Sequence, residues 1–124
     1  MAVGDALTTE AERQLVAWGR AVLLEATGGR TGRPRSVVVG FVEEPDGSLL
    51  VAAGSPDARW AADLADEARA VVTVGDRRWL VTAEPLTGDE AAAAVRGLIL
   101  RYGTPSEGLG SGPSFRLRPS GPKP

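Results

Sequence analysis

The sequence predicts a mainly β domain of the α+β class, a small antiparallel barrel of about six strands with two or three helices. Apolar runs joined by short turns rich in Gly, Pro and Asp predict strands paired as hairpins. Helical patterns are few and do not alternate regularly with the strands, which disfavours a doubly wound parallel sheet. The 124 residues, 43% hydrophobic and 24% charged, suit one globular domain. We expect this domain at 9–118, an N-terminal extension at 1–8 and a disordered tail at 119–124.

The first predicted element is a helix that begins after Thr9. Thr9 and Glu12 have the spacing of a capping box, in which each side chain hydrogen-bonds the backbone amide of the other residue. Leu15, Trp18 and Val22 then recur on one helical face. We expect this face to cover the core.

The remaining elements are predicted from turn residues and apolar spacing. The continuous β-branched run 37–42 indicates a strand covered on both faces. Asp57 is a plausible cap for a helix whose buried side carries Trp60 and Leu64, and Tyr102 closes the apolar stripe of a later helix. In chain order we expect strands at 21–27, 37–42 and 49–53, a helix opened by Pro56-Asp57, a hairpin of 70–74 and 77–84, a helix from a capping box at 87–90 to about Arg101, and a short strand at Phe115 and Leu117.

Several residue types that carry chemistry are absent from the chain. Without His or Cys, the Ser-His-Asp and Cys-His mechanisms and most zinc sites are excluded, so we expect no metal site. A net charge of −2 argues against nucleic acid as a partner. No apolar run approaches the ~20 residues of a membrane span, and we expect a cytoplasmic protein. Either the domain performs no chemistry, or a bound cofactor carries it.

The turn at residues 28–36 concentrates positive charge in an acidic chain. Arg30, Arg33 and Arg35 lie on a glycine-rich segment, and no acidic residue occurs between Glu25 and Glu43. Glycines let backbone N–H groups approach a ligand, and guanidinium groups match phosphate or carboxylate oxygens. The turn is therefore either an anion-binding hairpin that holds the charged tail of a cofactor, or a solvated turn whose arginines confer solubility.

The same turn carries a resemblance to a known family. Val22-Leu23-Leu24 leads into Thr27-Gly28-Gly29-Arg30-Thr31-Gly32-Arg33-Pro34-Arg35, and Val51–Ser55, Trp60 to Leu64 and Val71–Val74 follow in order. This pattern, over about residues 15 to 118, resembles the deazaflavin-dependent nitroreductases, also described as coenzyme F-420-dependent quinone reductases. The resemblance implies a split β-barrel, often dimeric, that transfers a hydride from a reduced 8-hydroxy-5-deazaflavin (coenzyme F-420) to quinones, nitroaromatics or similar small acceptors.

The resemblance also assigns roles to individual residues. Gly29 would be a cofactor-binding residue of the turn, and Arg30, Thr31 and Arg35 would contact the phosphate and glutamyl carboxylates of the cofactor. Tyr102 would be the catalytic residue, since it matches a tyrosine that faces the substrate in relatives. The remaining cofactor-binding positions would be Ser36, Val37 and Val38 along the ring groove, Ala52, Ala53, Gly54 and Ser55 on the other side of the cofactor, and Trp60 and Asp63 from the short helix.

Departures from the family pattern keep other interpretations open. Relatives usually carry asparagine where this chain has Asp63, which is less favourable near an anion, and their tyrosine-rich segment is reduced here to Tyr102. Trp60 could be a core residue, and Tyr102 a helix-end residue with its hydroxyl in water. The alternatives are an enzyme on the same barrel that uses flavin mononucleotide (FMN), and a non-catalytic carrier of a cofactor or lipid.

Overall fold

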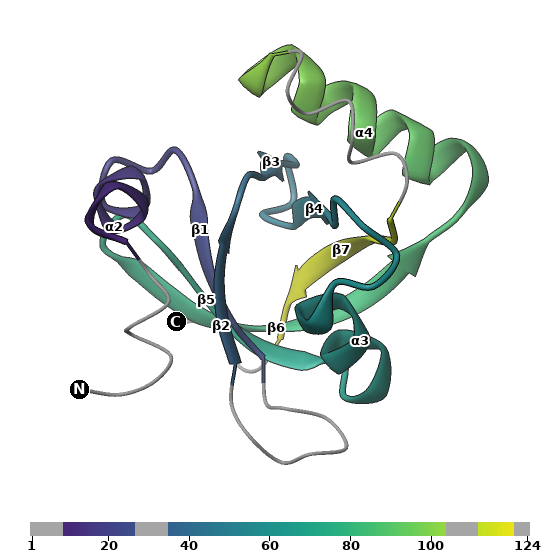
Figure 1. The fold of residues 1–124 in the computed structure, drawn as a ribbon, viewed down its shortest axis with the longest axis horizontal. Coiled ribbons are helices and arrows are strands. Elements are labelled where there is room, and N and C mark those ends of the chain that lie inside the picture. Colours follow the sequence, from purple (N-terminus) through teal and green to yellow (C-terminus); the bar gives the residue numbers. More distant parts are fainter. Residues whose placement is uncertain (1–8, 27–34, 104–111, 121–124) are drawn as a thin grey trace.

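The computed structural model describes residues 9–26, 35–103 and 112–120, and shows a strongly curved antiparallel sheet with helices packed around it (Figure 1). The predicted barrel class is confirmed, with seven strands in the described residues in place of about six. The sheet order is β2-β1-β5-β6-β7-β4-β3. The helices are α2 (Glu10–Ala17), α3 (Arg59–Asp66) and α4 (Gly88–Tyr102), and the strands are β1 (Val22–Ala26), β2 (Arg35–Val39), β3 (Val42–Glu43), β4 (Leu49–Ala52), β5 (Arg69–Val74), β6 (Arg77–Leu86) and β7 (Ser114–Pro119).

The expected single strand over residues 37–42 is two strands, β2 and β3, which end the sheet on opposite sides. The chain bends between them at Gly40 and Phe41. A Cβ atom on Gly40 would lie 2.9 Å from Cε2 of Tyr102, so any other residue here would require that ring to shift. Phe41 turns into the core. The residues of β2 are half-buried, which corrects the expectation of cover on both faces.

The core lies inside the curve of the sheet, and α3 contributes to it. Trp60 packs against Phe115 with ring centroids 6.2 Å apart. Phe115 and Leu117 alternate with two arginines along β7, so the apolar pair points inward and the charged pair outward. The predicted closing strand is confirmed, and it joins β6 to β4.

The capping box of α2 is confirmed, but its predicted buried face is wrong. Thr9 Oγ1 accepts from the Glu12 amide at 3.1 Å, and the Glu12 carboxylate accepts from the Thr9 amide at 2.9 Å. The helix ends at Ala17, so Trp18 is its C-cap and is 66% exposed, whereas Val16 is buried. The predicted face included Trp18 and Val22, which lie beyond the end of the helix, and for this reason the wrong face was assigned as buried.

The starts of the other two helices also differ from the sequence expectations. Ala58, and not Asp57, is the N-cap of α3, without a side-chain hydrogen bond. Thr87 is the N-cap of α4, but its hydroxyl makes no capping hydrogen bond, so the predicted capping box is absent there. Burial of Trp60 and Leu64 on α3, and of Leu98 on α4, is confirmed.

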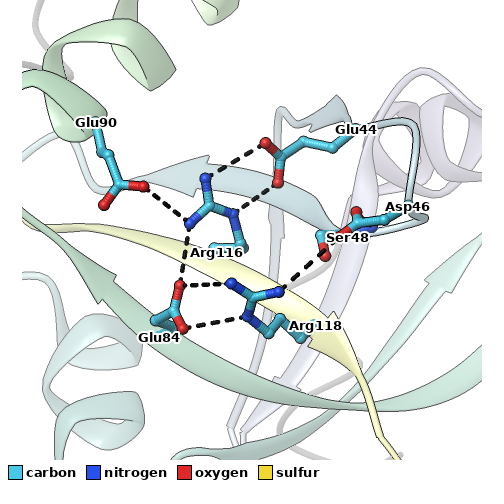
Figure 2. A network of polar contacts seen from close by, with 7 residues as sticks. All are labelled: Glu44, Asp46, Ser48, Glu84, Glu90, Arg116 and Arg118. Carbon is cyan, nitrogen blue, oxygen red and sulfur yellow. Dashed lines mark hydrogen bonds and ion pairs between the residues drawn. The ribbon is translucent and has the colours of Figure 1, made fainter.

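A network of charged side chains joins α4 and the turn after β3 to the outer face of β7 (Figure 2). Arg116 Nε donates to Glu44 at 2.7 Å, and its Nη1 donates to Glu84 at 3.0 Å and Glu90 at 3.3 Å. These contacts, that of Glu44 foremost, raise the pKa of Arg116. Hydrogen bonds from Arg118 and then Arg116 lower the pKa of Glu84. The contact with Glu90 is the point at which this network reaches α4.

The tight turn between β3 and β4 carries a further carboxylate of this network. Asp46 Oδ1 accepts from the backbone amide of Ser48 at 2.9 Å, and this hydrogen bond is the main cause of the lowered pKa of Asp46. Its other oxygen lies 3.9 Å from Arg118. Asp46 therefore both shapes the turn and joins it to β7.

Candidate functional site

Two residues that the resemblance assigns to the cofactor, Arg35 and Asp63, contact each other. Arg35 begins β2 and Asp63 lies on the inner side of α3. Arg35 Nε donates to Asp63 Oδ2 at 2.8 Å, and the Asp63 residue is only 8% exposed. Removing one member of a buried ion pair typically costs about 3–5 kcal/mol of stability, because the other charge is left without a partner. The pair thus fixes the start of β2 against α3.

The three following residues of β2 alternate between the core and the outer face. Val37 packs against the core, as does Val39. Ser36 and Val38 occupy the alternate positions and point to the other face of the sheet. Val38 lines two cavities beside α2, of about 390 and 220 Å³. The outer face of β2 is therefore the accessible side of this strand.

The larger of these two cavities, which we call the α2–α4 cavity, lies between α2, β2 and the C-terminal end of α4. Its volume is about 390 Å³, within the range of small-molecule sites. It brings together Val38 and Tyr102, two predicted site residues that are 64 positions apart in the chain. Most of its wall is apolar, with one carboxylate and one guanidinium. The lining residues are Glu12, Leu15, Arg20, Ala21, Val38, Val39, Gly40, Leu98 and Tyr102.

Tyr102 lines this cavity, and its hydroxyl is hydrogen-bonded to the backbone. The hydroxyl donates to the Arg20 carbonyl at 2.7 Å and accepts from the Phe41 amide at 3.1 Å. Arg101 Nε also donates to it, at 3.0 Å. These contacts tie the end of α4 to the chain before β1 and to the bend after β2, and they favour a positioning role for Tyr102.

The predicted segment 52–55 follows the end of β4 and packs against residues 112–113, which lead into β7. Ala52 and Ala53 are buried, whereas Gly54 and Ser55 are exposed. The Ala53 amide donates to the Pro113 carbonyl at 2.8 Å. A Cβ atom on Gly112 would lie 2.5 Å from the Ala53 carbonyl oxygen, so this packing of backbone on backbone requires glycine. The small residues at 52–54 therefore allow close packing of another segment, and the exposed end leaves Ser55 accessible.

Some predicted positions lie outside the described residues, and some described residues were missed. Gly29, Arg30 and Thr31 fall in the segment 27–34, which the structure does not describe. Gly40 was not singled out, although a glycine that interrupts a β-branched run signals a bend or close approach. Arg101 was also missed. Its guanidinium stacks over the Phe41 ring at 4.7 Å and lines a cavity of about 620 Å³ at the C-terminal end of α2.

Comparisons with solved structures place the chain in a set of proteins with the same fold. A structure described as an F420-H2 dependent reductase (FDR-A) is 25% identical, with a TM-score of 0.69, over 80% of this chain and 94% of that chain. HutZ, a heme storage protein from Vibrio cholerae, is 19% identical, with a TM-score of 0.68 and 91% of each chain covered. A structure described as a domain-swapped dimer is 23% identical, with a TM-score of 0.68, over 88% of this chain and 95% of that chain. The last two likenesses concern the fold alone.

Sequence comparison identifies the family. The sequence matches none of the curated proteins with which it was compared. Across the described residues, no helix has both the length and the apolar character that a membrane crossing requires. A family model described as F420H(2)-dependent quinone reductase matches residues 6–104, most of the chain. The chain therefore belongs to the F420H(2)-dependent quinone reductase family.

Proposed function

We propose that this protein is an oxidoreductase that transfers a hydride from reduced coenzyme F-420 to a quinone, nitroaromatic or similar small acceptor. The family match over residues 6–104 is the observation that carries the proposal. The α2–α4 cavity supports it, because a mostly apolar cavity with few polar groups suits a small planar acceptor. When bound, the reduced coenzyme supplies the hydride, and the chain supplies binding and orientation.

The described residues near the start of β2 fit an anionic cofactor tail. Arg35 uses only its Nε for Asp63, and in the described residues its two terminal amino groups have no other hydrogen-bond partner. A guanidinium has five N–H donors, so four remain for phosphate or carboxylate oxygens. We propose that Gly29, Arg30 and Thr31 add to this contact. We also propose, as the family resemblance implies, that the backbone at 36–38 and 52–55 borders the ring, with Trp60 and Asp63 beside it.

Within this proposal Tyr102 shapes the acceptor site and water supplies the proton. Its hydroxyl proton is engaged by the Arg20 carbonyl, and the ring covers Gly40 in the cavity wall. Direct protonation of the acceptor by Tyr102, which the resemblance implies, stays a prediction. The two roles differ in how far the loss of the hydroxyl lowers turnover.

A fluorescence titration with purified coenzyme F-420 tests the proposal. We expect saturable binding by the wild type and weaker binding by Arg30→Ala and Arg35→Lys, since each weakens a charge-assisted contact worth about 1.5–3 kcal/mol. Arg69→Ala is the matched control, because Arg69 is exposed and pairs with the nearby Glu67. Reduced coenzyme should then be oxidised by menadione. Equal binding by all four proteins, or the absence of binding by the wild type, would contradict the proposal.

The same assays separate the alternatives. Preferential binding of FMN would replace the deazaflavin with a flavin on the same barrel. Binding of coenzyme without oxidation by quinones or nitroaromatics would make the protein a carrier. A heme role comparable to that named for HutZ has less support here, because the sequence has no His or Cys to serve as the usual axial ligand. We also propose a homodimer and a cytoplasmic location, of which the dimer is testable by light scattering of the purified protein.

A further inference from the structure

Asp63 is the one charged residue that is buried in the described part of the chain. It lies on α3 among Trp60, Ala61 and Leu64, all of which belong to the core. A carboxylate in such surroundings needs a partner, because desolvation of an isolated charge is costly. In the described structure this partner is the guanidinium of Arg35, whose Nε lies 2.8 Å from Asp63 Oδ2.

Among the described residues, the geometry of the pair leaves one edge of the guanidinium without a hydrogen-bond partner. The side chain of Arg35 is 32% exposed while that of Asp63 is 11% exposed, so the pair has an inner carboxylate and an outer guanidinium. Paired carboxylates often engage an arginine through two parallel hydrogen bonds. Here a single contact through Nε holds the group, and both terminal amino groups remain outside that contact. Asp63 therefore orients Arg35 without occupying its terminal donors.

The same carboxylate reduces the positive potential at those donors. An anion at the terminal amino groups is attracted by the guanidinium and repelled, from farther away, by Asp63. Coulomb energies scale with the charge of the ligand, so the repulsion increases with each negative charge that the ligand carries. A neutral amide at this position could still accept from Nε, and it would keep the orientation while removing the repulsion.

We propose that Asp63 is a specificity-determining residue that holds Arg35 in place and weakens the binding of highly charged anions there. This inference rests on the proposed function, which takes Arg35 as a contact of the cofactor. The repulsion by Asp63 therefore lowers the affinity for pyrophosphate at Arg35 more than the affinity for one singly charged group of the cofactor tail, and it reduces the advantage that the higher charge of pyrophosphate would give.

The test compares the wild type with Asp63→Asn and with Asp66→Asn as the matched control. Asp66 lies on the same helix and is exposed, so its variant makes the same change in net charge away from the pair. Inorganic pyrophosphate is titrated by calorimetry, and coenzyme F-420 by fluorescence. We expect Asp63→Asn to bind pyrophosphate about tenfold more tightly, about 1.4 kcal/mol, and coenzyme within about threefold of the wild type. Asp66→Asn should match the wild type for both ligands.

Two further variants guard the conclusion. Asp63→Glu keeps the charge and should match the wild type, and Asp63→Ser is a second neutral replacement with a smaller side chain, used if Asp63→Asn does not fold by circular dichroism. Equal pyrophosphate affinity in the neutral variants and the wild type would overturn the inference. Failure of the wild type to bind coenzyme would instead count against the proposed function, since the pyrophosphate comparison does not depend on the coenzyme.

Discussion

Replacing Tyr102 with phenylalanine should destabilise the protein while leaving the wall of the α2–α4 cavity in place. The variant keeps the ring over Gly40 but removes the hydroxyl that accepts from the Phe41 amide and donates to the Arg20 carbonyl. Phe41 is buried, so its amide loses its hydrogen-bond partner, at a cost of about 1–3 kcal/mol. With an unfolding entropy of about 0.26 kcal/mol/K for 124 residues, 2 kcal/mol lowers Tm by about 8 °C.

Urea denaturation and steady-state turnover together decide the role of Tyr102. The urea midpoint should fall with an unchanged m value, and the control Leu100→Ala, on the same helix and 88% exposed, should change stability by less than about 0.5 kcal/mol. If Tyr102 positions the chain, kcat with menadione at a temperature where the variant is folded should fall by less than about tenfold. Loss of a general acid typically costs about 10²–10⁴-fold. Unchanged stability, or a loss of turnover in that range, would refute the positioning role.

Three further changes test the packing and the charge network. Gly112→Ala places a Cβ atom 2.5 Å from a backbone carbonyl oxygen, and we expect a loss of about 1–3 kcal/mol in urea denaturation, where no change would contradict the close packing. Trp60→Ala should cost about 3–5 kcal/mol, whereas Trp18→Ala should cost less than about 0.5 kcal/mol; similar midpoints for the two would show that the burial is wrong. The folded-state pKa values of Asp46 and Glu84 are lowered from 3.8 and 4.5, so these carboxylates stabilise the fold above those values. That stabilisation is lost as the pH falls through the lowered pKa values, so Tm measured from pH 6 down to about pH 3 should fall less steeply in Glu84→Gln than in the wild type.

Two features that depend on residues close in the chain were predicted correctly, whereas two other local predictions, the caps of α3 and α4, were wrong. The hairpin at Gly75-Asp76 and the capping box at Thr9 involve residues close in the chain, and both are confirmed. Residues 37–42 instead form parts of two strands, and the bend between them packs against the ring of Tyr102, about 60 positions away. Gly40 within the run could have signalled a bend or a close approach, but it does not identify the distant residue that approaches, and the apolar character of the run indicated one strand.

The candidate site shows the same division. The sequence identified Arg35 and Asp63 separately, through the family resemblance, and gave Asp63 an unfavourable place beside an anion. The structure joins them in an ion pair, which explains how a carboxylate is accommodated there. That Val38 and Tyr102 line one cavity follows from the path of α4 across the barrel, which residue spacing does not encode.

The bend between β2 and β3 has a consequence for how the barrel can widen. These two strands are consecutive in the chain but occupy opposite ends of the sheet order, so the circle is completed by covalent continuity through Gly40 and Phe41. Because β2 and β3 do not pair with each other, a local separation of these two strands would break no hydrogen bonds between them. At this bend the Tyr102 hydroxyl from α4 accepts from the Phe41 amide and donates to the Arg20 carbonyl, so one side chain helps to hold the bend in place.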